Sequence, residues 1–368
     1  MKVLILGSGM MGRAIAFGLN NHSDFDRIAI ADKDRKSLKS AELFLNKKDI
    51  DFDILNVEKE NDVRKKFQEY DVVISAIPYN FNYNLTKLSI ETKTHFLDLG
   101  GNNEIVNKQK KLDKVAKQNN VTIIPDCGLA PGLASVIVRD IVENLDSVDY
   151  VKMRVGGLPL EPIPPLNYQI VFSPNGLINE YVEDAIALDN GKIVTKKSMT
   201  EIEKIVFPQP FGELEAFNTS GGCSTLPYTY KDKIGYLDYK TIRYLGHCEE
   251  FKPLLKLKSR DELIKYLTKN LPHNEKDVVL MKIFAKGKIN NENKNLEYTT
   301  IDYYDEKNNI TSMMRTTGYP VSIIAQMIEK GSINNPGVYC NEEIVPPGEF
   351  FKQLEKRNIK VTKEVFNG

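Results

Sequence analysis

The N-terminal segment constrains the fold more than any other part of the chain. An apolar run, KVLIL, leads directly into a glycine-rich turn, and the helix-forming segment RAIAFGL follows. The turn consists of Gly7, Ser8, Gly9, Met10, Met11 and Gly12. In a strand–turn–helix unit of this pattern, Gly7 permits the tight turn, Gly9 lets the backbone approach a pyrophosphate, and Gly12 lets the helix lie close to the strand. Because the helix N-terminus offers N–H groups to phosphates, the segment predicts a dinucleotide site that includes Met10 and Met11.

An acidic residue indicates which dinucleotide this site prefers. Asp32 follows Gly12 by twenty residues and ends the second apolar run, RIAIAD. A carboxylate at this position accepts hydrogen bonds from the adenosine ribose and repels a 2′-phosphate, so NAD is predicted and NADP is less favoured. The preference is not absolute, because Arg13, Lys33 and Arg35 are close enough in sequence to accommodate a phosphate. The simpler alternative is a glycine turn followed by an ordinary surface aspartate.

Residues 1–145 alternate short apolar runs with amphipathic, helix-like segments. The runs are KVLIL, RIAIA, DFDIL, DVVISAI, HFLDL and VTIIP. They are nearly continuous in Val, Ile and Leu, as strands buried on both faces should be. Six strands with intervening helices predict an α/β fold, a doubly wound parallel sheet of the Rossmann type.

The pattern changes after the first domain. Residues 146–315 contain longer segments that alternate polar and apolar side chains, such as YVKMRVGGL and LEYTTIDYYD, which predicts an α+β domain with an antiparallel sheet. Residues 316–368 return to helical character, with PVSIIAQMIEKG starting at a proline and ending at a glycine. We expect these C-terminal helices to pack back on the Rossmann domain, which makes the second domain an insertion.

Composition excludes several classes of protein. Lys plus Arg number 50 and Asp plus Glu number 50, so the formal net charge is zero and a nucleic-acid partner is not predicted. No apolar stretch approaches the length of a membrane span, and no secretory signal is evident. The four cysteines have neither disulfide-framework nor metal-ligand spacing, so no metal site is predicted. A cytoplasmic protein is the interpretation that fits best.

The carboxyl ends of the predicted parallel strands supply candidate site residues, since ligands of open α/β sheets bind there. Ala76, Ile77 and Pro78 would lie along the cofactor, with Tyr79 near the substrate. Two further strand ends carry carboxylates that would approach the reacting centre, Asp98 and Asp126. An aspartate in such a place often caps a helix or satisfies turn amides instead, and for Asp98 both interpretations stand.

A second group of candidates lies in the later half of the chain. Thr219 and Ser220 begin a glycine loop, TSGGCST, whose hydroxyl and backbone donors suit an anion. Arg243 could bind a carboxylate bidentately. His247 could carry a proton or position another group, and a structural imidazole is an equal alternative.

Several longer motifs extend this interpretation. They are GSGMMG, PDCGLAPGLASV, GGLPLEPIPPLNYQIVFSPNGLINEY, FGELEAFNTSGGCSTLPYT, YKTIRYLGHCEEFK, TTGYPVSIIAQMI and VPPGEFF. With these motifs in this order the chain resembles the saccharopine dehydrogenase family over nearly its whole length, and within it the lysine 6-dehydrogenases most. The resemblance implies a Rossmann domain, an inserted substrate and dimerisation domain, C-terminal helices, and NAD(P)-linked oxidation of an amine carbon by a homodimer or higher homo-oligomer.

The resemblance also implies a reaction. L-Lysine and NAD would give 2-aminoadipate 6-semialdehyde, ammonia and NADH. The family pattern does not identify the catalytic base. From the chemistry of the reaction, we expect Arg243 with the loop of Thr219 and Ser220 to anchor the substrate carboxylate and Asp126 or Asp98 to lie near the reacting amine. The alternatives are a saccharopine or carboxynorspermidine dehydrogenase, which acts on a secondary amine, and a non-catalytic NAD-binding protein that contacts other proteins.

Overall fold

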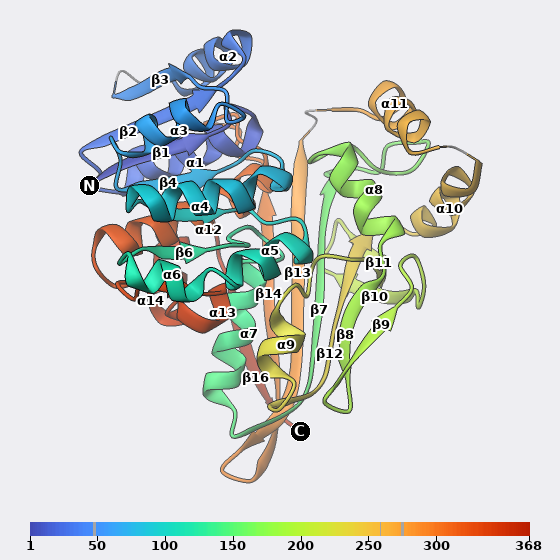
Figure 1. Cartoon of the computed structure of the whole chain (residues 1–368). Coiled ribbons are helices and arrows are strands. Elements are labelled where there is room, and N and C mark those ends of the chain that lie inside the picture. The colour runs from blue at the N-terminus through green and yellow to red at the C-terminus, as the bar shows by residue number, and fades with distance from the viewer. Residues whose placement is uncertain (47–48, 258, 274–275) are drawn as a thin grey trace. The chain divides into compact units, whose positions relative to one another are not determined.

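The computed structural model describes residues 1–46, 49–257, 259–273 and 276–368 (Figure 1). The chain separates into two compact units, each described below by itself. Unit 1 comprises Met1–Val136 and Met314–Asn358, and unit 2 comprises Ile137–Met313 and Ile359–Gly368. The boundaries fall inside two helices, α7 (Leu133–Asn144) and α12 (Ser312–Glu329), so the first unit ends earlier than the sequence pattern predicts.

Unit 1 contains a parallel sheet in the order β15-β6-β5-β4-β1-β2-β3. Its strands are β1 (Lys2–Leu6), β2 (Arg27–Asp32), β3 (Ile50–Ile54), β4 (Val72–Ser75), β5 (His95–Asp98), β6 (Thr122–Ile124) and β15 (Gly337–Val338). The order confirms the predicted doubly wound α/β fold. The seventh strand, β15, was not predicted because its two residues are too few to form a pattern.

Helices cover both faces of this sheet, as the apolar strands require. The central strands are fully buried, with no exposure of Ile5 or Val73. Figure 1 shows α4 and α5 in front of the sheet and α12 behind it. A Cβ atom at Gly18 would lie 2.9 Å from Ser322 Oγ, so glycine is what lets α1 approach α12. The helices within this unit are α1 (Met10–His22), α2 (Arg35–Leu45), α3 (Glu60–Phe67), α4 (Asn82–Thr92), α5 (Asn103–Lys110), α6 (Asp113–Gln118), α13 (Asn341–Ile344) and α14 (Pro347–Lys356).

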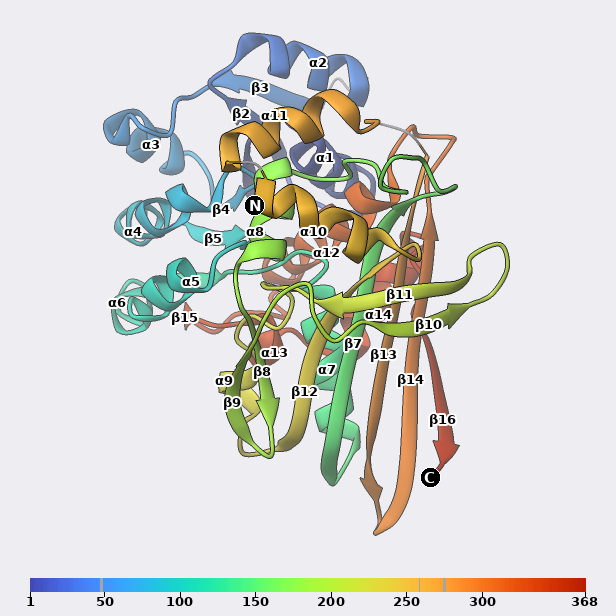
Figure 2. The same ribbon diagram turned by 90° about the vertical axis from the view of Figure 1, so that its right-hand side faces the viewer.

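Unit 2 contains a second, mixed sheet in the order β10-β11-β12-β7-β13-β14-β16, with β8 pairing β12 and β9. Figure 2 shows the long strands side by side and β10 and β11 running across them. The strands are β7 (Ser147–Pro159), β8 (Ala185–Asp189), β9 (Lys192–Lys196), β10 (Glu203–Phe207), β11 (Gly212–Asn218), β12 (Ile234–Arg243), β13 (Asp277–Ile289), β14 (Glu292–Tyr303) and β16 (Thr362–Asn367). The predicted antiparallel pairing is wrong in one place, because β7 and β12 are parallel. A long connection between these two strands permits that direction.

Four shorter helices accompany this sheet, α8 (Pro174–Val182), α9 (Leu226–Tyr230), α10 (His247–Leu257) and α11 (Arg260–Asn270). Two further helices pass between the units, as described above. Among all helices of the described residues, none has the length and apolar character needed to cross a membrane.

The C-terminal segment differs from the prediction at its end. Met314–Asn358 belongs to the first unit, but β16 pairs antiparallel with β14 in the second sheet. Lys363 helps to hold it there, since its Nζ lies 2.9 Å from Asp140 Oδ2 and over the ring of Tyr298. Residues 316–368 are therefore not all helices packed on the Rossmann domain. The short polar strand TKEVFN gave no clear sequence signal of its own.

Candidate functional site

The glycine turn is held beside the end of β4 by close backbone packing. Gly7 has a φ of +101°, and its N–H donates to Ala31 O at 2.8 Å. A Cβ atom on Gly7 would lie 2.8 Å from Ala76 O and 2.9 Å from Ile77 Cγ2. Only glycine satisfies both constraints. The structure thereby brings the predicted cofactor residues Gly7, Ala76 and Ile77 together, with Pro78 exposed next to them.

The first turn of α1 is open to an anion. Gly9 is the N-cap of α1 and provides no side-chain cap, so the amides of the first turn remain available. Gly9 is exposed, and nothing lies within 4 Å of where its Cβ would be. Met10 and Met11 are half-buried in this turn. Gly12 packs on the loop itself, because its Cβ would lie 1.9 Å from Gly7 O. The loop therefore fits a dinucleotide pyrophosphate.

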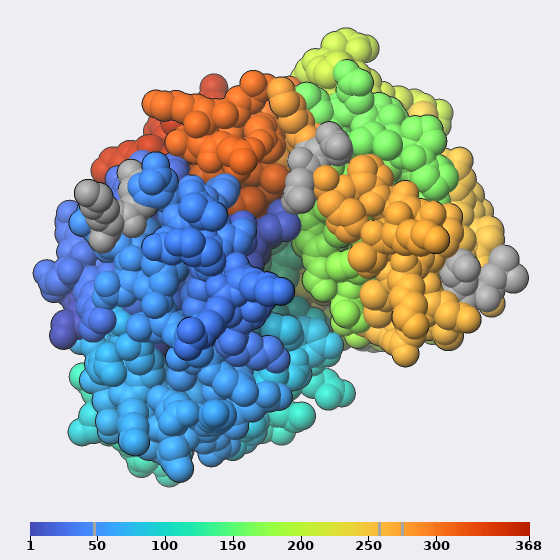
Figure 3. Space-filling view, turned by 90° about the horizontal axis from the view of Figure 1, so that it is seen from above, coloured from blue at the N-terminus to red at the C-terminus, as the bar shows by residue number. Residues whose placement is uncertain are grey.

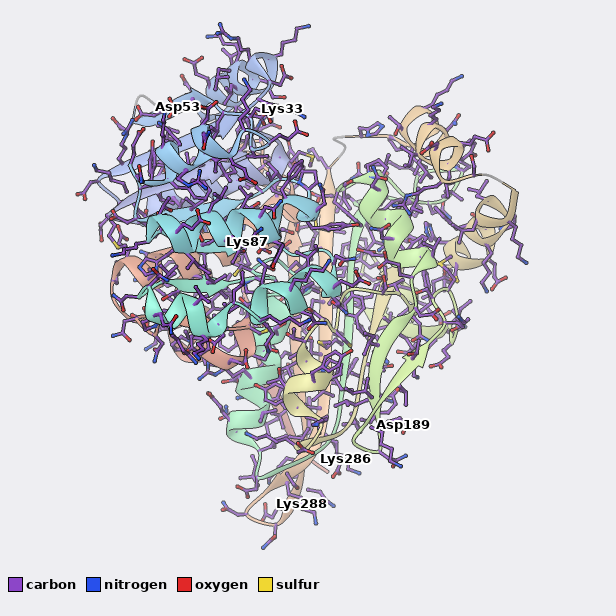
Figure 4. All side chains as sticks on the ribbon, viewed as in Figure 1. Lys33, Asp53, Lys87, Asp189, Lys286 and Lys288 are labelled. Atoms are coloured by element: carbon purple, nitrogen blue, oxygen red, sulfur yellow. The ribbon has the colours of Figure 1, made fainter. Side chains whose placement is uncertain are left out.

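Asp32 is fixed at the end of β2 by the glycine turn. Its Oδ2 accepts hydrogen bonds from Ser8 N and Ser8 Oγ, both at 2.8 Å, and its Oδ1 accepts one from Asp34 N at 3.0 Å. Asp32 keeps some exposure, so its oxygens can also meet ribose hydroxyls. Arg13 Nε donates to Ser8 O at 3.0 Å, which ties this guanidinium to the loop. Lys33 projects from the β2–α2 turn in Figure 4.

The carboxylate of Asp98 forms hydrogen bonds within the fold. Asp98 is fully buried and accepts hydrogen bonds at 2.7 Å from both Gly100 N and Gln109 Nε2. Burial raises the pKa of the Asp98 carboxyl. Of the two interpretations of this residue, the structure favours the one in which it satisfies turn amides over a contact with substrate.

Asp126 and Tyr79 lie near the same strand ends. Asp126 adopts a φ of +63°, and a Cβ on Gly100 would lie 1.8 Å from its Oδ1, so its carboxylate packs on the Gly100 backbone. Its carbonyl accepts from Asn341 Nδ2 at 2.9 Å. The Tyr79 ring covers Gly101, where a Cβ would lie 3.1 Å from Tyr79 Cδ1. Roles for Asp126 and Tyr79 in the reaction stay predictions.

Unit 2 buries the guanidinium of Arg243 at the end of β12. Its Nη1 donates to Ile242 O at 2.8 Å and its Nε to the Tyr181 hydroxyl at 2.9 Å. The Tyr168 ring lies 4.7 Å from its central carbon. Among the described residues, Nη2 has no hydrogen-bond partner and no carboxylate forms an ion pair with this arginine. Arg243 therefore has donors left for an anion.

His247 is buried and contacts Tyr181, the same residue that accepts a hydrogen bond from Arg243. Its Nε2 lies 2.9 Å from the Tyr181 hydroxyl and its Nδ1 lies 2.8 Å from Leu166 O. Burial, with a smaller effect of the Arg243 charge, lowers the pKa of His247 to about 3. The imidazole is therefore neutral near pH 7, which favours the positioning role over the proton carrier.

The hydroxyl-rich loop holds α8 in place. Ser220 N donates to Glu180 O at 3.0 Å, and Ser220 Oγ donates to Asn179 O at 3.1 Å. Thr219 Oγ1 lies 2.7 Å from Thr241 Oγ1, and both residues are buried. The Ser220 hydroxyl proton is thus already used, and the threonine pair also interacts with the Tyr239 hydroxyl through Thr241.

Glu180 is a candidate that the sequence interpretation missed. It lies in α8 beside Tyr181, is only partly exposed, and its carboxylate makes no hydrogen bond with the described residues. Burial, partly offset by the charge of Arg243, raises the pKa of Glu180 to about 7. A signal was present, because Glu180 follows the buried Leu177 by three residues and so falls on the apolar face of the helix.

Helix α11 braces the helix that carries Glu180 and Tyr181. Arg260 Nη2 donates to Asn175 O at 3.2 Å, and Arg260 also contacts Asn179 of α8. Figure 3 shows the orange surface of α11 beside the green segment that contains α8. The orientation of α8 is thus supported from outside as well as by the Ser220 loop.

Two other buried cations of this sheet, Arg154 and Lys240, are paired with carboxylates, and two lysines at its far end lie away from α8 (Figure 4). Arg154 Nη1 pairs with Asp238 Oδ1 at 2.7 Å, and Lys240 Nζ pairs with Glu203 Oε2 at 2.7 Å. Lys286 and Lys288 lie near the β13–β14 turn, away from α8 (Figure 4), and face the start of β7. In the described ranges, no three His, Cys, Asp or Glu side chains cluster as a metal site would require.

Comparison with protein families agrees with both halves of this description. Residues 3–124 match the family model of the saccharopine dehydrogenase NADP binding domain, and residues 128–359 match that of the saccharopine dehydrogenase C-terminal domain. The chain belongs to the saccharopine dehydrogenase family. The resemblance seen in the sequence motifs is thus confirmed, whereas the resemblance to lysine 6-dehydrogenases within the family stays a prediction.

Relatives within the saccharopine dehydrogenase family are distant. The mitochondrial alpha-aminoadipic semialdehyde synthase of Rattus norvegicus is 24% identical over 70% of this chain, which spans 28% of that protein. Saccharopine dehydrogenase [NADP(+), L-glutamate-forming] of Saccharomyces cerevisiae is 27% identical over 54% of this chain and 44% of its own length. The solved structure of apo saccharopine dehydrogenase (L-Glu forming) from S. cerevisiae has a TM-score of 0.80 at 20% identity, covering 99% of each chain, which supports the same fold.

Alanine variants of Gly9 and Gly12 distinguish an effect on cofactor affinity from an effect on stability. A methyl group at Gly9 meets no neighbour, and the φ of −69° there suits alanine, so Gly9→Ala should keep its melting temperature. The methyl group fills the space through which a pyrophosphate reaches the backbone, so the Kd for NAD or NADP should rise about tenfold. Calorimetric titration measures this change.

The comparison variant is Gly12→Ala, whose methyl group would lie 1.9 Å from Gly7 O. It should lower the melting temperature as well as the affinity. An unchanged cofactor affinity in Gly9→Ala would contradict the assigned loop.

Proposed function

We propose that this protein catalyses the NAD-dependent oxidative deamination of the ε-amine of L-lysine. The observation that supports this proposal most is the buried Arg243, which has donors left and no carboxylate partner among the described residues. Such a guanidinium suits the α-carboxylate of one amino acid. The partly exposed Glu180 nearby offers a negative charge to an ammonium group.

The charges around Arg243 favour lysine over saccharopine. Saccharopine carries more carboxylates than lysine, so a site for it needs more than one uncompensated cation. Arg154 is paired with Asp238, and Lys240 is paired with Glu203. Of the three buried cations Arg154, Lys240 and Arg243, Arg243 is the one without an ion pair in the described residues. Saccharopine remains the second candidate because the S. cerevisiae relative described above is named for it.

Deamination requires a group that accepts a proton from the substrate ammonium. The lysine ε-ammonium has an ordinary pKa of about 10.4, and the carbon can lose hydride only after the nitrogen regains its lone pair. Glu180 is suited to take that proton, since its pKa of about 7 leaves it ionised in mildly alkaline solution. A bound nicotinamide cofactor supplies the hydride acceptor. Water then adds to the substrate imine and ammonium leaves, so that lysine, NAD and water yield the semialdehyde, ammonium, NADH and a proton.

Asp32 supports NAD as the cofactor. Its carboxylate is held by Ser8 and remains partly exposed, and a fixed negative charge at this position repels a 2′-phosphate. Arg13, one of the three cations considered for such a phosphate, uses its Nε–H for the Ser8 carbonyl. The family model is named for NADP, so the preference for NAD is this protein's own proposed property.

The reaction is tested with a panel of amines. Folded protein with L-lysine and NAD should produce NADH, with activity rising between pH 7 and about 9, toward the amine pKa. In the reductive direction, semialdehyde with ammonium should be consumed and semialdehyde with glutamate should not. The opposite result would establish the saccharopine reaction. Cofactor binding without turnover of any amine would support the non-catalytic alternative.

Cofactor preference is tested by Asp32→Asn. The amide keeps an oxygen for Ser8 but removes the charge, so the NAD to NADP ratio of kcat/KM should fall about tenfold. Asp34→Asn, two residues further along the exposed turn, is the matched control and should leave that ratio unchanged. Equal ratios in Asp32→Asn and the native protein would contradict the role of the carboxylate.

The proton acceptor is tested by Glu180→Gln. Because Glu180 must be ionised, kcat/KM of the native protein should fall as the pH decreases through about 7. The variant should lose this limb of the pH profile and roughly 10²-fold in kcat. Glu183→Gln, three residues further along and exposed, serves as control. A native limb near 7 that persists in Glu180→Gln would assign it to another group.

A further inference from the structure

Tyr181 and His247 form a chain of hydrogen bonds that ends at Arg243 and orients its guanidinium. We propose that Tyr181 and His247 are positioning residues that hold the Arg243 guanidinium so that its Nη2 side binds the α-carboxylate of the substrate. This inference rests on the proposed function and deepens it. The sequence left His247 open between a proton carrier, a positioning group and a structural imidazole, and it did not single out Tyr181.

The donors and acceptors of this chain of contacts can have only one order. Arg243 Nε can only donate, so the Tyr181 hydroxyl accepts from it at 2.9 Å. The single Tyr181 hydroxyl proton is then donated to His247 Nε2, also at 2.9 Å. His247 must therefore carry its proton on Nδ1, which donates to Leu166 O at 2.8 Å. A backbone carbonyl thus fixes the guanidinium through two side chains.

This order leaves a defined part of Arg243 for a ligand. One Nη1 proton goes to Ile242 O, and the Nε proton goes to Tyr181. The remaining donors are one Nη1–H and both Nη2–H groups, which lie along the end of the guanidinium. That end matches the two oxygens of a carboxylate. Loss of the Tyr181 contact would free Nε and let the group rotate away from this geometry.

Aromatic packing keeps the chain of contacts dry and rigid. The Tyr181 ring meets Phe251 edge-on with centroids 4.8 Å apart, and the His247 ring meets Tyr168 at 5.4 Å. The hydroxyl, imidazole and guanidinium are all buried. Hydrogen bonds in such surroundings are stronger than in water, and a group left without its partner is more costly. The guanidinium is consequently oriented before the substrate arrives.

The primary experiment compares two amines. L-Lysine has a carboxylate, and cadaverine is the same diamine without one. Tyr181→Phe should raise KM for L-lysine about tenfold, which corresponds to one oriented hydrogen bond, and change kcat less than threefold. For cadaverine the variant should match the native protein. Arg243→Gln should remove the preference for lysine, and the double variant should lose nothing more.

Two control variants distinguish positioning from a general loss of structure. Tyr70→Phe removes another buried tyrosine hydroxyl, one without a hydrogen bond in the described residues, and should leave KM for both amines unchanged. At position 247, glutamine retains an acceptor where Nε2 lies and leucine does not. His247→Gln should therefore keep a lower KM for lysine than His247→Leu.

The outcomes separate this inference from the proposed function. An unchanged KM for lysine in Tyr181→Phe, or an equal rise with cadaverine, would overturn the inference while lysine turnover still stands. If saccharopine is oxidised in place of lysine, the proposed function fails. The KM for saccharopine is then compared between Tyr181→Phe and the native protein, and an unchanged KM overturns the inference. If no amino acid is oxidised, calorimetry with L-lysine decides, and binding that is equal in native protein and Tyr181→Phe overturns it.

Discussion

Burial of a positive charge that has no carboxylate partner is the constraint on which the arrangement of unit 2 depends. Removing the Arg243 guanidinium from water is costly unless its protons meet acceptors and its faces meet polarisable groups. A backbone carbonyl, the Tyr181 hydroxyl and the Tyr168 ring supply these contacts. These contacts come from separate segments of the chain. The guanidinium is therefore oriented only when unit 2 has folded.

In unit 1 the main constraint is the close approach of the glycine turn to neighbouring backbone. At Gly7 a side chain would collide with Ala76 and Ile77, which follow β4, and at Gly12 it would collide with the loop itself, whereas at Gly9 there is open space. The loop is therefore rigid on its protein side and open on the side where phosphates bind. Unit 1 thus offers uncharged backbone amides to a pyrophosphate, whereas unit 2 offers a buried guanidinium to the carboxylate of the proposed substrate.

The sequence predicted those features that depend on local spacing. The Gly7 to Asp32 pattern, the parallel strands and the family resemblance each arise within short segments, and the structure or the comparisons agree with them. Arg243 was identified as a carboxylate anchor from its motif, although no observation yet tests that role. The chain of contacts through Tyr181 and the raised pKa of Glu180 depend on segments far apart in sequence, which a spacing argument does not bring together.

Tertiary contacts decide what local reasoning left open or missed. For Asp98 the sequence left two interpretations open, and its hydrogen bonds with Gln109 and Gly100 favour the structural one. The strands β15 and β16 are too short or too polar to be recognised alone, and each exists because a longer strand pairs with it. The parallel direction of β7 and β12 is set by the path of the connection and not by side-chain pattern.

The hydrogen bonds of Asp32 also limit how this protein could be redesigned. One carboxylate oxygen, Oδ2, holds both the amide and the hydroxyl of Ser8, while the same side chain is the group expected to discriminate between cofactors. Cofactor discrimination and loop architecture thus depend on the same side chain. An engineer who replaces Asp32 with a small residue to admit a phosphate would loosen the glycine turn as well. Changing Asp32 and Ser8 as a pair is the route by which cofactor choice could be altered while the loop is kept.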